Sequence, residues 1–435
     1  MDARDRSRRF LAVASLAARV YLGYKAITIR QRRSGLSSQE VEARRRAHHH
    51  WSAYQLYDLA VRQGGLLIKF GQILGSRPDL IPDEYVAVLS RLQDQVPPRP
   101  FPVIERQITR ELGRPLADVF SRFERQPSAS ASLAQVHRAA LKDGRTVAVK
   151  VQYPGIREVV QTDLGSIRFL LRILAALERN LDFGPIIEEI SRNVPLELDF
   201  INEGHNAELI AGNFAPRDDI IVPRIHWEYT TRRVLVMEFL EGIKITDIDA
   251  LQAAGIDLQA VSRLVTGAYC EQLFLHGMFH ADPHPGNLFV RPGPQLVMLD
   301  FGLCRKLDDQ FRLGYAKLVN AMITGNPPEM VRAFRDLGFR VKHAEDPAPF
   351  LAMRRAFMES SAPGRAYADP DLVAEANARI AQAVRANPLV QIPREFLLIM
   401  RVVGLLSGLG KHLDSRVNVI GAFLPYTKAA LAETR

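Results

Sequence analysis

Three side chains in the second half of the chain have the types and spacing that phosphoryl transfer requires. Asp282 and Asn287 lie five residues apart, and Asp300 opens an Asp-Phe-Gly sequence thirteen residues after the asparagine. One carboxylate can face the attacking oxygen, while an amide and a second carboxylate can hold a divalent metal on the phosphates. We therefore predict that Asp282 is catalytic and that Asn287 and Asp300 bind Mg²⁺.

Two short strands and a rigid loop should position these groups. The segment from Asp282 to Asn287 contains two prolines and a glycine, which are turn formers. Apolar runs at 288–290 and 296–299 predict strands, joined by a turn at 291–294. An Asp-Phe-Gly sequence alone is common, but its combination with the upstream loop is much more specific.

A small-residue loop followed by a lysine indicates nucleotide binding in the first half. Residues 126–137 form a turn-like segment between two strand-like runs, and Lys150 lies near the end of the second run. This is the layout of the nucleotide-covering loop and the phosphate-holding lysine in protein-kinase-like folds. We predict contacts with ATP or ADP from Lys150 and from the loop residues Ala129, Ser130, Ala131 and Ser132.

Alanine and serine stand in this loop where an ordinary kinase has glycine. A Cβ on each residue restricts how closely and how flexibly the backbone can approach phosphates. Nucleotide handling should therefore differ from that of an ordinary kinase. By itself Lys150 would be a surface lysine on an edge strand, but its place after the loop argues against that reading.

An acidic helical stretch offers partners for Lys150. Asp199 and Glu203 are four residues apart and share a helix face, whereas Glu197 points elsewhere. One of these carboxylates should hold the lysine toward the phosphates, and we predict Glu203. The alternative is that these acidic residues form only the solvated face of a helix.

A strand over 234–242 runs into a turn and resembles the hinge between a small and a large lobe. We predict that the backbone of Glu238, Phe239 and Leu240 meets the edge of the adenine. Many buried strands have the same composition, so this signal is of moderate specificity.

A second polar pair lies on an apolar, glycine-bearing helix expected over 64–82. Lys69 and Gln72 are three residues apart and share one face of that helix. Taken alone, the pair reads as a lysine reaching to the surface beside an ordinary helix contact.

Composition and charge limit the possible classes of function. The 435 residues exceed one ordinary domain, and two cysteines are too few for a disulfide framework. A net charge of +9 favours anionic partners such as nucleotides, phospholipid headgroups or nucleic acid. Nucleic acid is the least favoured, because the basic residues lie outside any recognisable binding module.

No uninterrupted apolar run of eighteen residues occurs, so a spanning helix is not expected, and neither is secretion. We expect a cytoplasmic protein that contacts the inner face of a membrane peripherally. Residues 1–50 are rich in arginine around an apolar stretch at 10–24, as in a basic helix lying on an anionic membrane. The alternative is a solvated, partly packed helix.

The remaining pattern is mostly helical. We predict three regions: a basic helical extension with the Lys69 helix (1–100), a small lobe (101–240) and a helical large lobe (241–435). Further helices are expected at 159–178, 185–211, 262–276, 310–324, 328–337 and 370–386, with a buried helix at 396–409.

In this order the segments resemble the UbiB/AarF family of atypical, protein-kinase-like proteins, over roughly residues 60 to 415. Lys69-Phe70-Gly71-Gln72 is similar to the family's K-x-G-Q motif, and Glu197-Leu198-Asp199 is similar to its E-x-D motif. The match also includes the alanine-rich loop, Lys150, Glu203, Asp282, Asn287 and Asp300. Ser130 departs from the alanine that is common in the family.

The resemblance implies an α+β fold of the two-lobed protein-kinase type with a helical N-terminal extension. It also implies binding of ATP with Mg²⁺, ATPase activity, and support of isoprenoid-quinone or related lipid biosynthesis at a membrane. Lys69 and Gln72 would gate the site by facing Glu197 and Asp199. A lipid or quinone precursor and quinone-biosynthesis proteins would be partners. The spanning helices that family members often carry near the C-terminus are not expected here.

Two rival functions remain. A protein kinase acting on other proteins is disfavoured because Ala281 stands where a typical kinase has an arginine, and no Ala-Pro-Glu follows Asp300. A nucleotide-gated scaffold that binds lipid without catalysis is disfavoured because the metal-binding and base residues are intact.

Overall fold

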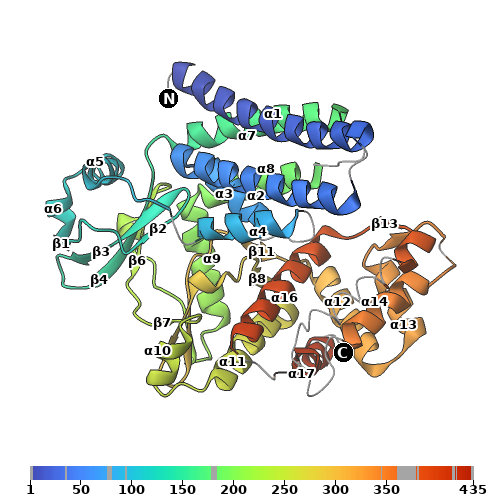
Figure 1. Ribbon diagram of the computed structural model, residues 1–435. Coiled ribbons are helices and arrows are strands. Elements are labelled where there is room, and N and C mark those ends of the chain that lie inside the picture. The colour runs from blue at the N-terminus through green and yellow to red at the C-terminus, as the bar shows by residue number, and fades with distance from the viewer. Residues whose placement is uncertain are drawn as a thin grey trace. The chain divides into compact units, whose positions relative to one another are not determined.

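The computed structural model forms two compact units of mixed helix and sheet (Figure 1). It describes residues 3–34, 37–75, 81–93, 96–177, 184–343, 345–359, 379, 382–413, 417 and 419–432. The first unit is Met1–Asn202 with Ile225–Phe239, and the second is Glu203–Arg224 with Leu240–Arg435. The chain therefore changes unit inside helix α9 (Phe200–Asn213) and again directly after strand β6 (Val234–Glu238).

The first unit contains an antiparallel sheet of five strands. Its order is β1-β3-β4-β6, and β2 pairs with β3. The strands other than β6 are β1 (Phe120–Phe123), β2 (Ala129–Ser130), β3 (Ala134–Leu141) and β4 (Thr146–Gln152). Along β4, Val147, Val149 and Val151 alternate with other residues and are fully buried, so they share one face of the sheet. Lys150 therefore points to the opposite face.

Helices make up the rest of the first unit. They are α1 (Ala3–Ser34), α2 (Ser38–Gln63), α3 (Leu66–Gly75), α4 (Asp83–Leu89), η1 (Ser90–Gln93), α5 (Phe101–Leu112), α6 (Leu116–Val119), α7 (Ile156–Leu177), α8 (Gly184–Glu197) and η2 (Trp227–Tyr229). Figure 1 shows α1 lying along α7, and α1 also packs on α2. Ser37 and Glu40 form a capping box that fixes the start of α2.

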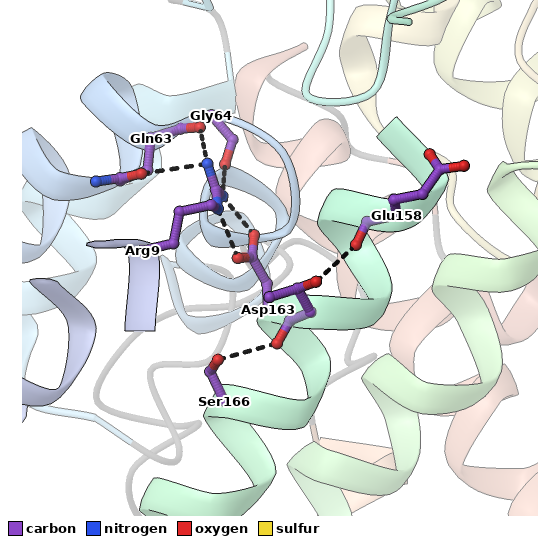
Figure 2. Close-up of polar contacts among 7 residues, drawn as sticks. Arg9, Gln63, Gly64, Glu158, Asp163 and Ser166 are labelled. Carbon is purple, nitrogen blue, oxygen red and sulfur yellow. Dashed lines mark hydrogen bonds and ion pairs between the residues drawn. The ribbon is translucent and has the colours of Figure 1, made fainter. Parts of the chain in front are cut away.

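A largely buried arginine joins three of these helices (Figure 2). Arg9 of α1 donates to both carboxylate oxygens of Asp163 on α7, from Nε at 2.9 Å and from Nη2 at 2.6 Å. Its Nη1 donates to the carbonyl of Gln63 at 2.7 Å, at the C-terminal end of α2. The Asp163 side chain is only 2% exposed, so the ion pair is shielded from water. Burial raises the pKa of Asp163, and the hydrogen bonds and charge of Arg9 oppose that rise.

We did not expect a spanning helix, but α1 meets the length and composition criteria for one. Residues Arg4–Arg33 form a helix that is long and apolar enough to cross a bilayer, by length and composition. Two charges within residues 10–29, Arg19 and Lys25, do not lower the hydropathy of this helix enough to exclude it. Packed helices of soluble proteins can have the same composition, and α1 packs on α2 and α7.

The second unit is built around a small sheet in the order β5-β10-β9-β7. Its strands are β5 (Ile220–Ile221), β7 (Ile243–Lys244), β9 (Leu288–Arg291) and β10 (Gln295–Met298). Two further strand pairs are β8 (Met278–His280) with β11 (Cys304–Lys306), and β12 (Arg340–Val341) with β13 (Leu389–Gln391). Strands β9 and β10 match the two apolar runs from which they were predicted.

Besides its share of α9, the second unit contains the helices predicted near 262–276, 310–324, 328–337 and 396–409, together with α10, α14, α17 and the short η4, which were not predicted. In chain order, these helices are α10 (Ile248–Ala253), α11 (Leu258–Glu271) with a π-helical turn at Gln272–His276, η4 (Pro285–Asn287), α12 (Asp309–Thr324), α13 (Pro327–Asp336), α14 (Ala348–Glu359), α16 (Arg394–His412) and α17 (Val419–Ala432). Asp308 caps α12 by accepting from the Phe311 N–H at 2.8 Å. The helix predicted at 370–386 lies largely outside the described residues.

One helix differs from its predicted environment. We expected 396–409 to be a buried helix, but in α16 Leu397 is 54% exposed and Met400 is 44% exposed. Ile399, Val402 and Leu409 are buried. The apolar run in the sequence therefore did not distinguish a helix with one buried face from a helix that is buried on all sides.

Candidate active site

His280 connects the two predicted acidic positions of the second unit. Its Nδ1 accepts a hydrogen bond from the Asp282 N–H at 3.1 Å, and its Nε2 lies 2.5 Å from the Asp300 carbonyl oxygen. Because Nδ1 accepts, the proton on Nε2 is the one donated to that carbonyl. One buried ring thus fixes the backbone at the predicted base and at the predicted metal ligand.

The position of His280 is itself fixed by its neighbours. Its N–H donates to Oε1 of Gln272 at 2.9 Å, and Gln272 lies in the π-helical turn that ends α11. Such turns are frequent at functional sites. The ring also meets Phe301 edge to face, with the centroids 5.7 Å apart. Sequence reasoning missed His280, although its place two residues before Asp282 could have suggested it.

Asn287 and Asp300 lie at the same end of the β9–β10 hairpin. Leu288 pairs with Met298, and one step further the Leu299 N–H donates to the Asn287 carbonyl at 2.9 Å. Asp300 follows with φ of 61°, a left-handed conformation that aspartate tolerates better than most residues. Backbone conformations of this kind cluster at functional sites, where the surrounding structure enforces them.

The donor set at this end of the hairpin suits magnesium. Asn287 and Asp300 supply an amide oxygen and a carboxylate, which are the hard ligands that Mg²⁺ prefers. Among the described residues there is no cluster of three or more histidine, cysteine, aspartate or glutamate side chains that would form an all-protein metal site.

Helix α9 supports the segment that follows Asp300. Asn206 donates from Nδ2 to the Phe301 carbonyl at 3.0 Å, and Glu203, one turn earlier, is only 2% exposed. The pKa of the Cys304 thiol is raised by burial first and then by the carboxylates of Glu203 and Asp300. Both carboxylates therefore lie within electrostatic range of the same sulfur. Sequence reasoning missed Asn206, which shares a helix face with Glu203.

Asp282 has a cationic neighbour that the sequence did not reveal. Arg401 of α16 places Nη2 3.4 Å from Oδ1 of Asp282, and the two side chains are 26% and 22% exposed. The arginine comes from 119 residues further along the chain. In the sequence it appeared only as an interruption of an apolar run.

In the first unit, the loop of Ala129 to Ser132 is closed by its own hydrogen bonds. The Ala131 N–H donates to the Ala134 carbonyl at 2.8 Å, and the Tyr153 hydroxyl donates to the Ala131 carbonyl at 3.1 Å. Ser130 Oγ lies 2.9 Å from the Tyr153 oxygen and therefore donates to it. The Ala131 N–H is thus already used in a hydrogen bond within the turn. The N–H groups of a glycine-rich loop, in contrast, can point toward phosphates.

Lys150 lies on β4 between Val136 of β3 and Leu235 of β6. Its ammonium is 5.3 Å from the ring centroid of Phe200, the first residue of α9, which gives a cation–π contact. The predicted orienting role of Glu203 toward Lys150 stays a prediction.

Of the four predicted gating residues, two form an ion pair with each other, and the other two form hydrogen bonds with backbone groups. Lys69 Nζ pairs with Glu197 Oε1 at 2.7 Å, and both side chains are mostly buried. Gln72 instead donates to the Leu92 carbonyl at 2.9 Å. Asp199 accepts from the backbone of Ile201 and Asn202 at the start of α9, which is the role of an N-cap. The gating role itself stays a prediction.

The predicted adenine-binding stretch continues the sheet of the first unit. Glu238 pairs with Val147, and the Phe239 N–H donates to the Thr146 carbonyl at 3.2 Å. The guanidinium of Arg138 lies 4.5 Å from the Phe239 ring centroid. A contact between this stretch and adenine would therefore have to use backbone groups other than the Phe239 N–H, such as those of Leu240.

A family model described as the ABC1 atypical kinase-like domain matches residues 91–334. The chain belongs to the ABC1 family. This confirms the resemblance to the UbiB/AarF group. The ABC1 span contains Lys150, Glu203, Asp282, Asn287 and Asp300, whereas Lys69 and Gln72 precede it.

Several relatives of this ABC1 chain carry kinase names. It is 37% identical over 392 residues to "AarF domain-containing protein kinase 1" of Xenopus tropicalis, covering 87% of this chain and 74% of the relative. It is 33% identical to "Protein ACTIVITY OF BC1 COMPLEX KINASE 8, chloroplastic" of Arabidopsis thaliana, covering 91% of this chain and 55% of that protein. These names support a phosphotransferase-type domain, and a kinase-like domain implies nucleotide binding.

A solved structure supports the fold of the ABC1 chain. "The complex structure of Rv3197-erythromycin from Mycobacterium tuberculosis" matches with a TM-score of 0.63 and 25% identity, covering 89% of this chain and 97% of that one. Together with the family match, this confirms the predicted α+β, kinase-like two-lobed fold with a helical N-terminal extension.

We predict that His280→Phe in this ABC1 chain lowers ATP turnover about 100-fold. Phenylalanine keeps the ring and its contact with Phe301 but loses both hydrogen bonds, so the backbone at Asp282 and Asp300 is no longer fixed. The measurement is Mg²⁺-dependent phosphate release, with thermal unfolding to verify the fold. His205→Gln, on the exposed side of α9, is the control. We call the two hydrogen bonds between the His280 ring and the backbone of Asp282 and Asp300 the His280 bridge. Turnover within a few-fold of wild type would show that the His280 bridge has no part in catalysis.

Proposed function

We propose that this ABC1 chain binds Mg-ATP and either hydrolyses it or transfers its phosphoryl group to a small molecule. The observation that carries the proposal is the His280 bridge, because it fixes Asp282 and Asp300 through one ring. The shared hairpin end of Asn287 and Asp300 supports it further. In this arrangement, hydrogen bonds hold in place the backbone segments of the proposed base and of the two proposed oxygen ligands.

Each residue has a distinct task in the proposed reaction. Asn287 and Asp300 would hold Mg²⁺, which when bound neutralises charge on the phosphates. Lys150 would hold the α- and β-phosphates, and Glu203 would orient Lys150. Asp282 would orient the nucleophile, a water or a lipid hydroxyl, and accept its proton at a carboxylate oxygen. The contact with Arg401 compensates the charge of Asp282 while no nucleophile is bound.

The proposed biological role is support of isoprenoid-quinone or related lipid biosynthesis. Small-molecule chemistry is favoured over protein phosphorylation by the environment of Ala281, whose side chain is buried and carries no charge. Its N–H donates to the Leu303 carbonyl at 2.8 Å, next to the β8–β11 pair. The mycobacterial relative forms a complex with erythromycin, so a chain of similar fold binds a small organic molecule.

The test is to follow the fate of the γ-phosphate in the purified chain. Turnover is measured with and without Mg²⁺, anionic liposomes and a phenol that mimics a quinone precursor, with Asp300→Asn as the inactive control. Release of inorganic phosphate supports the ATPase, and a phosphorylated phenol supports small-molecule transfer. Labelled protein would favour the kinase acting on other proteins. Nucleotide binding without turnover under every condition would favour the scaffold.

We further propose that α1 contacts an anionic membrane. Leu11, Leu22 and Ile29 are 63%, 62% and 48% exposed, and their spacing of eleven and seven residues puts them on one helix face. Arg30, Arg32 and Arg33 follow at the C-terminal end of the helix. Exposed apolar side chains beside arginines are what an anionic bilayer surface binds.

Leu22→Asp should weaken binding to anionic vesicles about tenfold, because the leucine no longer leaves water on binding. Co-sedimentation with vesicles, repeated at rising salt, measures both the apolar and the charge contribution. Leu397→Asp, at a comparably exposed leucine of α16, is the matched control. Equal binding by both variants would exclude α1 as the contact.

A further inference from the structure

An apolar cavity of about 290 Å³ lies among the helices of the first unit. Its walls come from α1, α2, α3, α4 and α7, through residues such as Leu16, Leu59, Phe70, Tyr85 and Ile167. Some of these, including Leu16 and Ile167, are buried, whereas Phe70 and Tyr85 are only partly buried. The cavity is therefore bordered by partly exposed as well as buried side chains.

The few polar groups of the cavity are all hydroxyls. Tyr24 and Tyr85 place their hydroxyl oxygens 3.4 Å apart, so one hydroxyl donates to the other. Ser52 also lines the cavity, is 1% exposed, and its Oγ has no hydrogen-bond partner among the described residues. A buried hydroxyl without a partner is unfavourable, so a ligand that bonds to it gains affinity.

The residues that line the cavity disfavour a charged ligand. None of the described residues that line the cavity carries an ionised side chain. A carboxylate or an ammonium group would lose its hydration there without gaining a partner. The ligand should therefore be neutral, mostly hydrocarbon, and have one hydrogen-bonding group.

We propose that this cavity binds one neutral aliphatic alcohol of about ten carbons, with its hydroxyl on Ser52 Oγ and its chain among Leu16, Leu59 and Ile167. An apolar cavity of roughly 150 Å³ holds benzene, so one nearly twice as large holds a chain of about this length. The site lies entirely in the first unit and needs no nucleotide. The proposal therefore goes beyond the proposed function and can be tested independently of it.

The first experiment measures equilibrium binding of 1-decanol to the full chain by dialysis. We expect saturable binding of one molecule per chain, and binding at least about tenfold weaker for decanoate. In Ser52→Ala, decanol affinity should fall about tenfold. 1-Chlorodecane has the same chain without a hydroxyl, so it should bind wild type and Ser52→Ala equally.

A second variant tests the location. Leu56→Trp places a larger side chain into the cavity from α2 and should abolish decanol binding. Tyr54→Trp, on the exposed side of the same helix, should leave binding unchanged. Thermal unfolding shows whether each variant is folded, and if Leu56→Trp is not, the Ser52→Ala comparison still decides. Absence of saturable binding, equal binding of decanoate, or decanol affinity unchanged in Ser52→Ala would each overturn the proposal.

Discussion

Asp300→Asn should reduce Mg²⁺-dependent ATP turnover about a thousandfold or more, the largest loss that we expect from any single substitution. The amide removes a negative charge from the proposed metal site, so phosphate charge is less well compensated in the transition state. Asparagine tolerates the left-handed φ of 61° as aspartate does, so the backbone bonds around Asp300 should persist. The variant therefore tests the charge rather than the fold.

Phosphate release and nucleotide affinity measured over a range of Mg²⁺ concentrations check this prediction. The matched control is Asp309→Asn, a nearby exposed aspartate at the start of α12, which should keep full turnover. Asp300→Ala is informative as a third variant, because alanine is less suited to φ above zero and should also lower the unfolding temperature. Near-wild-type turnover in Asp300→Asn would contradict the prediction that this carboxylate is a metal ligand.

Arg9→Met should lower the free energy of unfolding of the first unit by about 3 kcal/mol. Removing the guanidinium leaves the Asp163 carboxylate buried without its cation, and leaves the Gln63 carbonyl without that donor. Denaturant unfolding followed by circular dichroism measures the change. Arg46→Met breaks an ion pair with Glu42 whose side chains are more than half exposed, so it should cost less than about 1 kcal/mol.

The loss in Arg9→Met should depend on pH. Burial already raises the pKa of Asp163, and Arg9 lowers it part of the way back, so without Arg9 the pKa rises further. A carboxyl group whose pKa is higher in the folded than in the unfolded state binds protons more tightly when folded. The free energy of unfolding therefore falls as pH rises through the window between the two pKa values. The deficit relative to wild type should shrink from about pH 7 toward about pH 4.5.

A double variant separates the two causes. Arg9→Met with Asp163→Leu removes both charges, and its stability should recover most of the loss, because apolar replacements of buried ion pairs are often neutral. Equal stability of Arg9→Met and the double variant at neutral pH would show that the unpaired carboxylate is not the cause.

Local pattern predicted the parts of the site that are close together in the sequence. Strands β9 and β10, the loop from Asp282 to Asn287 and the strand that bears Lys150 all follow from turn residues and apolar runs over short windows. Positions within such windows fix one another through chain geometry alone. The chemistry of Asp282, Asn287 and Asp300 could thus be proposed before any fold was known.

Partners that are distant in the sequence could not be predicted in this way. Arg401 meets Asp282 across 119 residues, and Arg9 meets Asp163 across 154. Neither pair leaves a periodic signal, because a single charged residue in an apolar helix looks the same whether it is paired or solvated. The cap role of Asp199 is a local contact that the sequence reasoning did not consider, because it assigned this residue a motif-based gating role, which stays a prediction.

The long sequence separation between Arg9 and Asp163 affects how the first unit can fold during translation. At 5–20 residues per second, the ribosome needs roughly 8 to 30 s to make the intervening chain. During that delay α1 is outside the ribosome before α7 can cover it, with an apolar stretch long enough to cross a bilayer. Until α7 has been made, α1 therefore depends on α2, the other helix on which it packs, to cover its apolar side chains.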